Sequence, residues 1–190
     1  MELSLLFARV MDARAPEAIE PLCDLGVRLR AAPPSAQTLA LIQQVAWMQI
    51  WVERYEEAEA LLEYAVAVGR QQAAGALPMA LAMRGELGYR RGRLQASLAD
   101  TSEAASLATD FGQAHARGLA LTCQSRTEAV LGREADCRAT AHEAAALGAQ
   151  LGGVDSPVSA YGAPALGLLE LGLENPEAAV PHLERLVRTF

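Results

Sequence analysis

Hydrophobic residues recur along this chain at intervals of three and four, which is the spacing of one face of an α-helix. Short junctions interrupt the pattern at regular distances, and at each one a helix is predicted to end and another to begin. The turn residues of these junctions are Arg14, Glu53, Gly92, Gly132 and Glu174. Their spacings of 39, 39, 40 and 42 residues indicate a repeated unit of two helices.

The second helix of each unit carries a stripe at positions i, i+4, i+7 and i+11, and small residues dominate it. The stripe consists of Ile19, Cys23, Gly26; Ala58, Leu62, Ala65, Gly69; Ser97, Thr101, Ala104, Ala108; Cys137, Ala141, Ala144, Gly148; and Ala179, Leu183, Leu186, Phe190. Small side chains let helix axes approach to the short end of the usual range of about 8–10 Å. The stripe therefore predicts stacked helix pairs that bury their apolar faces on one another.

The first helices are predicted at about residues 36–52, 77–91, 115–131 and 157–173. Ser35 and Ser156 are suited to the N-cap, and Pro157 to the first helical position. The second helices are expected to stop at Gly75, Gly112 and Gly152-Gly153. We therefore predict an all-α fold, a right-handed superhelix of helix-turn-helix repeats. Its 190 residues form one domain with units at about 1–32, 35–74, 76–111, 113–152 and 156–190.

Composition and charge narrow the function. Alanine and leucine carry much of the 52% hydrophobic content, every basic residue is an arginine, and the formal net charge is -7. The electrostatic field of a chain with this negative charge repels a phosphate backbone and an anionic membrane surface. No apolar run reaches the ~20 residues of a membrane span, and the N-terminus lacks the pattern of a signal peptide. We expect a cytoplasmic protein that binds neither nucleic acid nor a membrane.

Residue types that support catalysis or metal binding are scattered. The histidines occupy unrelated places in the repeat: His115, His142 and His182. Of the three cysteines, Cys23, Cys123 and Cys137, the first and last lie on the stripe, which argues for small core residues. The odd number of cysteines and the lack of a C-x-x-C pair argue against a disulfide framework or a zinc knuckle. There is no G-x-S-x-G turn to present a nucleophile. We expect no catalytic residue, no metal and no cofactor.

Within each unit the spacing resembles the tetratricopeptide (TPR) repeat. Its signature positions correspond to Gly85, Gly92, Leu94, Ser97 and Ala104 in the third unit, and to Ala46, Tyr55, Ala58 and Ala65 in the second. The chain departs from the TPR pattern in two ways. Ile42, Leu81 and Leu121 stand where the repeat usually has tryptophan, and the period exceeds the usual 34 or so residues.

The longer loops and the alanine-rich composition are similar to the TPR-like region of large bacterial LuxR-type (MalT-like) transcription regulators. The likeness lies in "AYGAPALGLLELGLENPEAAVPHLERL" (160–186), "LCDLGVRLRAA" and "LGREADCRATAHEAAALG". Members of that group combine an ATP-binding module with a C-terminal helix-turn-helix. This sequence has neither, and without lysine it cannot form a G-x-x-x-x-G-K-[ST] loop. The resemblance implies a segment of a larger regulator that receives a signal.

In TPR-like stacks the first helices line a concave groove, and the groove positions vary between units as recognition requires. They correspond to Ala40, Gln43, Trp47, Ile50, Trp51; Met79, Ala82, Glu86, Tyr89, Arg90; and Leu119, Thr122, Arg126, Ala129, Val130. From these we predict a site for a peptide, protein or small effector at Gln43, Trp47, Trp51, Glu86, Tyr89, Arg90 and Arg126. The two tryptophans lie one turn apart on the same helix. They either form an aromatic wall of the groove or pack against the next unit.

Two further surfaces are candidates. The basic run Arg90, Arg91 and Arg93 suits the negative end of a helix, or alternatively an anion site. The last second helix ends in apolar residues that no further unit of this sequence covers. We predict self-association as a two-fold homodimer through Leu183, Leu186, Val187 and Phe190.

Three functions are therefore open: a sensor segment of a LuxR-type regulator, a free-standing TPR adaptor, and an all-α enzyme. The lack of a catalytic constellation disfavours the enzyme. The reading frame on either side of the chain distinguishes the first two.

Overall fold

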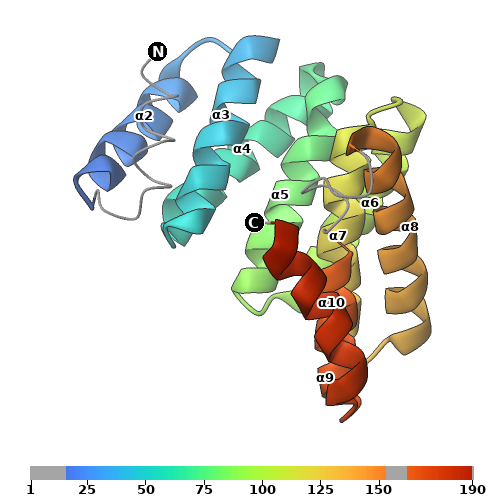
Figure 1. The fold of residues 1–190 in the computed structure, drawn as a ribbon. Helices are drawn as coiled ribbons and strands as arrows, with labels where there is room; N and C mark the ends of the chain where they lie inside the picture. The colour runs from blue at the N-terminus through green and yellow to red at the C-terminus, as the bar shows by residue number, and fades with distance from the viewer. Residues whose placement is uncertain (1–15, 153–161, 190) are drawn as a thin grey trace.

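The computed structural model describes residues 16–152 and 162–189, which are helical apart from short connections (Figure 1). The elements are η1 (Pro16–Ala18), α2 (Ile19–Ala31), α3 (Ala36–Trp51), α4 (Tyr55–Gln72), η2 (Ala74–Ala76), α5 (Leu77–Arg90), α6 (Leu94–Asp110), α7 (Ala114–Val130), α8 (Glu134–Gly152), α9 (Ala163–Gly172) and α10 (Pro176–Thr189). No strand occurs in these residues. The predicted all-α class is confirmed.

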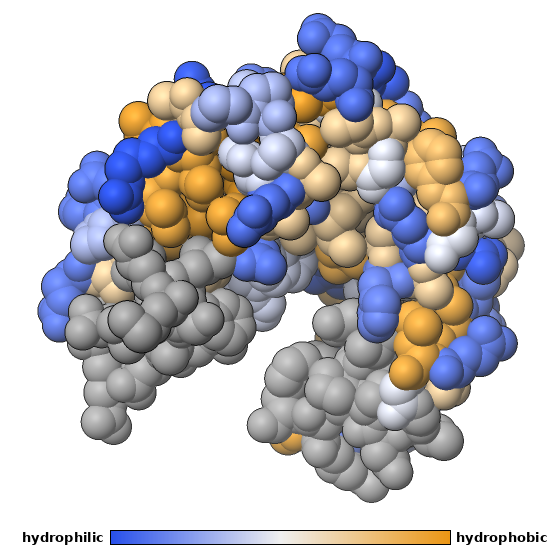
Figure 2. Space-filling model, turned by 90° about the horizontal axis from the view of Figure 1, so that it is seen from above, coloured by the Kyte–Doolittle hydropathy of each residue, from blue (hydrophilic) through white to orange (hydrophobic). Residues whose placement is uncertain are grey.

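Successive helices pair and the pairs stack in chain order. α3 packs on α4, α5 on α6, α7 on α8 and α9 on α10, while α2 packs on α3. The first helices of successive units also contact each other, since α5 packs on α7 and α7 on α9. The resulting molecule is an arch with a hollow on one side (Figure 2), and α3, α5 and α7 run along its inner side.

The turn inside each pair has the same backbone geometry. Glu53, Gly92, Gly132 and Glu174 have φ of 61°, 72°, 69° and 58°. The next N–H donates to the carbonyl five residues back, as in Arg54 to Gln49 at 2.8 Å. This is the Schellman arrangement, which satisfies the last carbonyls of the first helix. Four of the five predicted turn residues thus fall at the same structural position; Arg14 lies outside the described residues.

The small residues of the stripe allow close contact between the two helices of a pair. Ala58, Leu62, Ala65 and Gly69 are all buried in α4. In the α5–α6 pair, a Cβ atom on Gly85 would lie 2.4 Å from Cγ2 of Thr101. Side chains larger than hydrogen at this place would push the pair apart.

Helix boundaries agree with the sequence predictions except at two places. Ser35 caps α3, and its Oγ accepts a hydrogen bond from Thr38 N at 3.0 Å. Gly75 does not end α4, which stops at Gln72, but lies in η2. The predicted helix 157–173 is observed as α9 from Ala163; its predicted cap and first residue lie outside the described residues. The limits of the five units stay a prediction.

None of the helices in the described ranges is both long and apolar enough to cross a bilayer.

Candidate functional site

The repeat places a set of functional side chains next to one another on α3, α5 and α7. Trp47, Glu86 and Arg126 each lie six residues before the turn residue of their unit, and Trp51 and Arg90 each lie two before it. Because the units stack in register, equivalent positions become neighbours across the inner face. We call the group formed by Trp47, Trp51, Glu86, Tyr89, Arg90, Cys123 and Arg126 the concave cluster.

Glu86 is the centre of the concave cluster. Its side chain is 1% exposed, and a buried carboxylate is costly unless it is paired and hydrogen-bonded. Nε of Arg90 donates to its Oε1 at 2.8 Å, a guanidinium N–H of Arg126 donates to its Oε2, and the Cys123 thiol lies 3.3 Å from Oε2. Among the described residues, two guanidinium groups therefore share one carboxylate, which leaves a local excess of positive charge.

Each arginine of the pair also lies over an aromatic ring. Cζ of Arg90 is 5.3 Å from the ring centroid of Trp51, and Cζ of Arg126 is 4.9 Å from that of Tyr89. Both distances are within the range of cation–π attraction. The indoles of Trp47 and Trp51 meet edge to face, with centroids 6.3 Å apart and planes at 76°.

The two tryptophans differ in exposure, and this bears on the alternatives for them. Trp47 is half-buried against the main hydrophobic core. Trp51 is 52% exposed, although burial is usual for this residue type. Trp47 therefore packs against the core, whereas Trp51 is exposed beside Arg90.

Burial shifts the acid–base chemistry of the concave cluster. It raises the pKa of the Cys123 thiol to about 12, so that this side chain is protonated at neutral pH. It also lowers the pKa of Arg126 to about 10, which still leaves the guanidinium charged beside Glu86. Burial is likewise the main cause of the raised pKa of Tyr89. Nε of Arg126 is buried without a partner, so the cluster has a spare hydrogen-bond donor.

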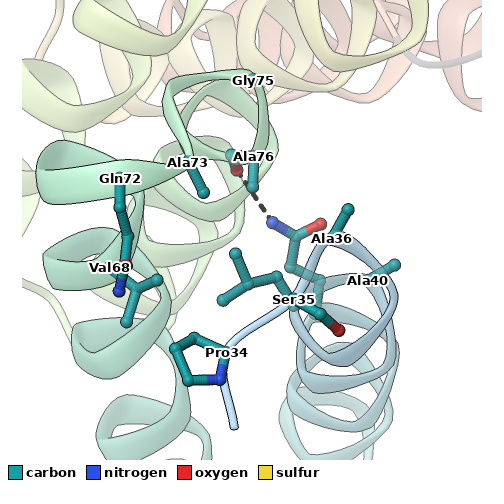
Figure 3. A pocket seen from close by; sticks show the side chains of 11 residues that line it. Pro34, Ser35, Ala36, Ala40, Val68, Gln72, Ala73, Gly75 and Ala76 are labelled. Atoms are coloured by element: carbon teal, nitrogen blue, oxygen red, sulfur yellow. Dashed lines mark hydrogen bonds between the residues drawn. The ribbon is translucent and has the colours of Figure 1, made fainter.

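Gln43 lies apart from the other predicted site residues. It is eight residues before Trp51 on α3, or about 12 Å along the helix. Its Nε2 donates to the Ala76 carbonyl at 2.8 Å, shown as the dashed line in Figure 3. There it borders an open pocket of about 510 Å³ between α3, the end of α4 and η2.

The basic run does not form one anion site. Arg90 binds Glu86 within the concave cluster, whereas Arg91 and Arg93 bind Glu59 of α4, with shortest contacts of 2.8 and 2.5 Å. The run is therefore divided between the inner face and an ion-pair network that joins neighbouring units.

Sequence reasoning missed several buried polar residues. In the sequence Cys123 is one of three cysteines without a paired motif, yet in the structure its thiol contacts Glu86. Glu128 and Glu170 are 3% and 5% exposed, and both lie four residues before a turn residue. Their shared position in the repeat is the feature of the sequence from which their burial could have been predicted. Glu170 pairs with Arg138 at 2.6 Å, whereas Oε2 of Glu128 is buried without a partner.

The residues predicted for self-association lie on or next to α10. Val187 is 76% exposed. Leu183 is half-buried and reaches Gly167 of α9, where a Cβ atom would lie 2.6 Å from its Cδ2. Phe190 and the side chain of Leu186 are outside the described part of the chain. Self-association stays a prediction. Within the described residues, no three His, Cys, Asp or Glu side chains are grouped as metal ligands.

Comparison with known proteins identifies the fold class of this chain. No family model and no curated protein matches this chain. Two solved structures do, a putative kinesin light chain from Podosopora anserina with nearly identical TPR-like repeats and a single-substitution variant of it. Their TM-scores are 0.66 and 0.68, each at 16% identity over 98% of this chain and 92% of that chain.

At this identity the likeness shows the fold alone. The chain is a solenoid of TPR-like helical repeats, as the sequence predicted. The comparisons do not single out the LuxR-type regulators among proteins with such repeats.

Proposed function

We propose that this chain is a non-catalytic scaffold that binds an extended acidic segment of a partner protein on its inner face. The supporting observation is the concave cluster, in which two guanidinium groups share one buried carboxylate beside an exposed indole. A carboxylate from the partner would pair with the partly exposed guanidinium group of Arg90 and neutralise the excess positive charge.

The extent of the concave cluster favours a peptide segment over a small effector. Its side chains come from three successive first helices, whose axes are expected about 8–10 Å apart. The row therefore spans roughly 20 Å, which is more than a small effector covers and within the reach of a segment of a partner protein. Trp51 offers such a segment a rigid apolar contact of the kind that often dominates binding energy.

The distribution of charge on the chain determines where an acidic segment binds. The chain as a whole carries a net charge of -7, so an acidic segment is repelled from most of the surface and attracted at the concave cluster. Electrostatic complementarity of this kind selects the orientation and speeds association more than it adds affinity.

A finer proposal concerns the context of the scaffold. The repeat period and the residues that resemble LuxR-type regulators support a cytoplasmic sensor segment, which binds its partner or effector and leaves nucleic acid to another module. The alternative is a free-standing TPR adaptor with the same inner face. A phosphate-loop module upstream and a helix-turn-helix downstream in the same reading frame are expected for the regulator; a gene that encodes neither supports the adaptor.

Peptide selection tests the binding function directly. A phage-displayed library of random nine-residue peptides is panned on the full chain, and enriched sequences are synthesised with fluorescein for polarisation measurements. We expect enrichment of Asp and Glu, and a loss of affinity of tenfold or more for Trp51→Ala with a melting temperature within a few degrees of wild type.

The matched control is Phe111→Ala, which removes an aromatic ring that is 45% exposed at the end of α6, outside the concave cluster. Its affinity should equal that of wild type. A library that yields no enriched peptide, or peptides that bind Trp51→Ala as well as wild type, contradicts the proposed function.

A further inference from the structure

The open pocket beside Gln43 has an uncharged lining. Its volume is about 510 Å³, within the range of ligand sites in proteins. Leu39 of α3 and Val68 of α4 are buried and form part of its wall, and the hydrogen bond from Gln43 to Ala76 ties α3 to η2 at its edge (Figure 3). Not one of the lining residues that the structure describes is charged, in a chain with 21% charged residues. The pocket therefore suits an apolar group.

The pocket and the concave cluster belong to the same face of α3. Ala36, Ala40, Trp47 and Trp51 follow one another at intervals of four, seven and four residues, which keeps them on one stripe of a helix. Ala36 and Ala40 line the pocket, and Trp51 contacts Arg90. Ala40 and Trp51 are eleven residues apart, or about 16 Å along the axis.

We propose that this pocket receives a large apolar side chain of the same partner segment whose carboxylate meets Arg90 and Arg126. This inference rests on the proposed function and adds a rule for the partner. An extended segment covers about 16 Å in about five residues. Arg90 lies over the ring of Trp51, so the acidic residue that pairs with Arg90 and the apolar residue, of the size of leucine, methionine or phenylalanine, are about five positions apart in the partner.

The pocket and the concave cluster favour different side chains of the partner. The uncharged pocket disfavours a carboxylate, because desolvation there has no compensating donor from a charged residue. The positive concave cluster favours one. A segment with both groups at the right separation is thus held in one register and one direction.

The phage-selected peptides test the spacing. We expect the enriched sequences to share an apolar and an acidic residue about five positions apart. Replacement of the apolar residue of a synthetic peptide by alanine should weaken its binding to wild type by tenfold or more, since one buried apolar side chain is lost.

Filling the pocket tests its role. Ala40 is exposed on α3, and Ala40→Trp should cost the unmodified peptide tenfold or more in affinity while the alanine-substituted peptide is unaffected, as a double-mutant cycle requires. Ala139→Trp, at an exposed alanine of α8 outside both the pocket lining and the concave cluster, is the matched control and should bind like wild type. If Ala40→Trp lowers the melting temperature, Ala40→Glu places a charge at the same mouth instead.

The outcomes separate this inference from the proposed function. Peptides that depend on Trp51 but show no fixed apolar spacing, and bind the Ala40 variants normally, overturn the inference and leave the proposed function standing. In that case the pocket is open to a free small molecule. Failure to enrich any peptide overturns both.

Discussion

Glu86 determines how the concave cluster is arranged, since both arginines are oriented by its two oxygens. We expect Glu86→Gln to lower the free energy of unfolding by about 2 kcal/mol, because two guanidinium groups lose their counter-charge and both reach solvent only in part. Chemical denaturation followed by circular dichroism measures this. Glu103→Gln removes the partner of Arg70 in an exposed pair and should change stability by less than about 1 kcal/mol; equal effects of the two variants would contradict this account.

The cysteines should differ in reactivity. Cys123 and Cys137 are buried, and burial raises the pKa of their thiols to about 12 and about 11. Cys23 is half-buried, and burial, followed by the charge of Glu57, raises the pKa of its thiol. Only the thiolate is alkylated, so iodoacetamide at pH 8 should label Cys23 first, and the other two only after unfolding. Mass spectrometry of digested protein decides; early labelling of Cys123 would refute its place in the concave cluster.

At the scale of elements, the pairs depend on close approach at small residues. Gly85→Ala should destabilise the chain by about 1–3 kcal/mol, because the new Cβ would lie 2.4 Å from Cγ2 of Thr101. Thr101→Ser removes that methyl group and keeps the hydroxyl that donates to the Ser97 carbonyl at 2.8 Å. The double variant should recover part of the loss in thermal unfolding, and no recovery would locate the strain elsewhere.

The left-handed turn residue within each helix pair leads to a second prediction at the scale of elements. Glu53 has a φ of 61°, a left-handed conformation that costs a residue with a Cβ roughly 1–2 kcal/mol. Glu53→Gly should therefore stabilise the α3–α4 pair, by less than about 1 kcal/mol once the greater freedom of glycine in the unfolded chain is included. Gly92→Ala, the reverse change at the equivalent position, should destabilise. Urea titration that shows the same sign for both would be inconsistent with the turn geometry.

The turns and helices also show which parts of the fold could be predicted from the sequence. The turns were predictable because their φ values select glycine or a polar residue at a fixed period, and the stripe because close packing selects small residues. The start of α9 was not predictable, because Pro157 and Pro164 both satisfy the preference for proline in a first turn. The pairing of Glu86 with Arg126, 40 residues away, was not predictable either, since it depends on the relative register of α5 and α7 and on side-chain rotamers.

At the scale of the whole molecule, α10 leaves apolar residues in solvent. Val180 and Val187 are 50% and 76% exposed and lie seven residues apart on one helix face. We predict that the chain forms a two-fold dimer through this face. Sedimentation equilibrium at about 100 μM should show dimers for wild type, since an interface with a dissociation constant near 10 μM would be mostly occupied. Val187→Glu should restore the monomer, and a monomeric wild type would disprove the contact.

The stacking of neighbours has a consequence for how the chain acquires its structure. Because contacts join helices that are adjacent or one unit apart, the loops that must close are short, and folding should be fast for a chain of this length. Within residues 16–152 and 162–189, α5, α6 and α7 have partners on both sides, whereas α2 and α10 have them on one. Nucleation is therefore favoured at the middle, where Glu86 and Arg126 meet, and amide hydrogens should exchange sooner toward both ends of the arch.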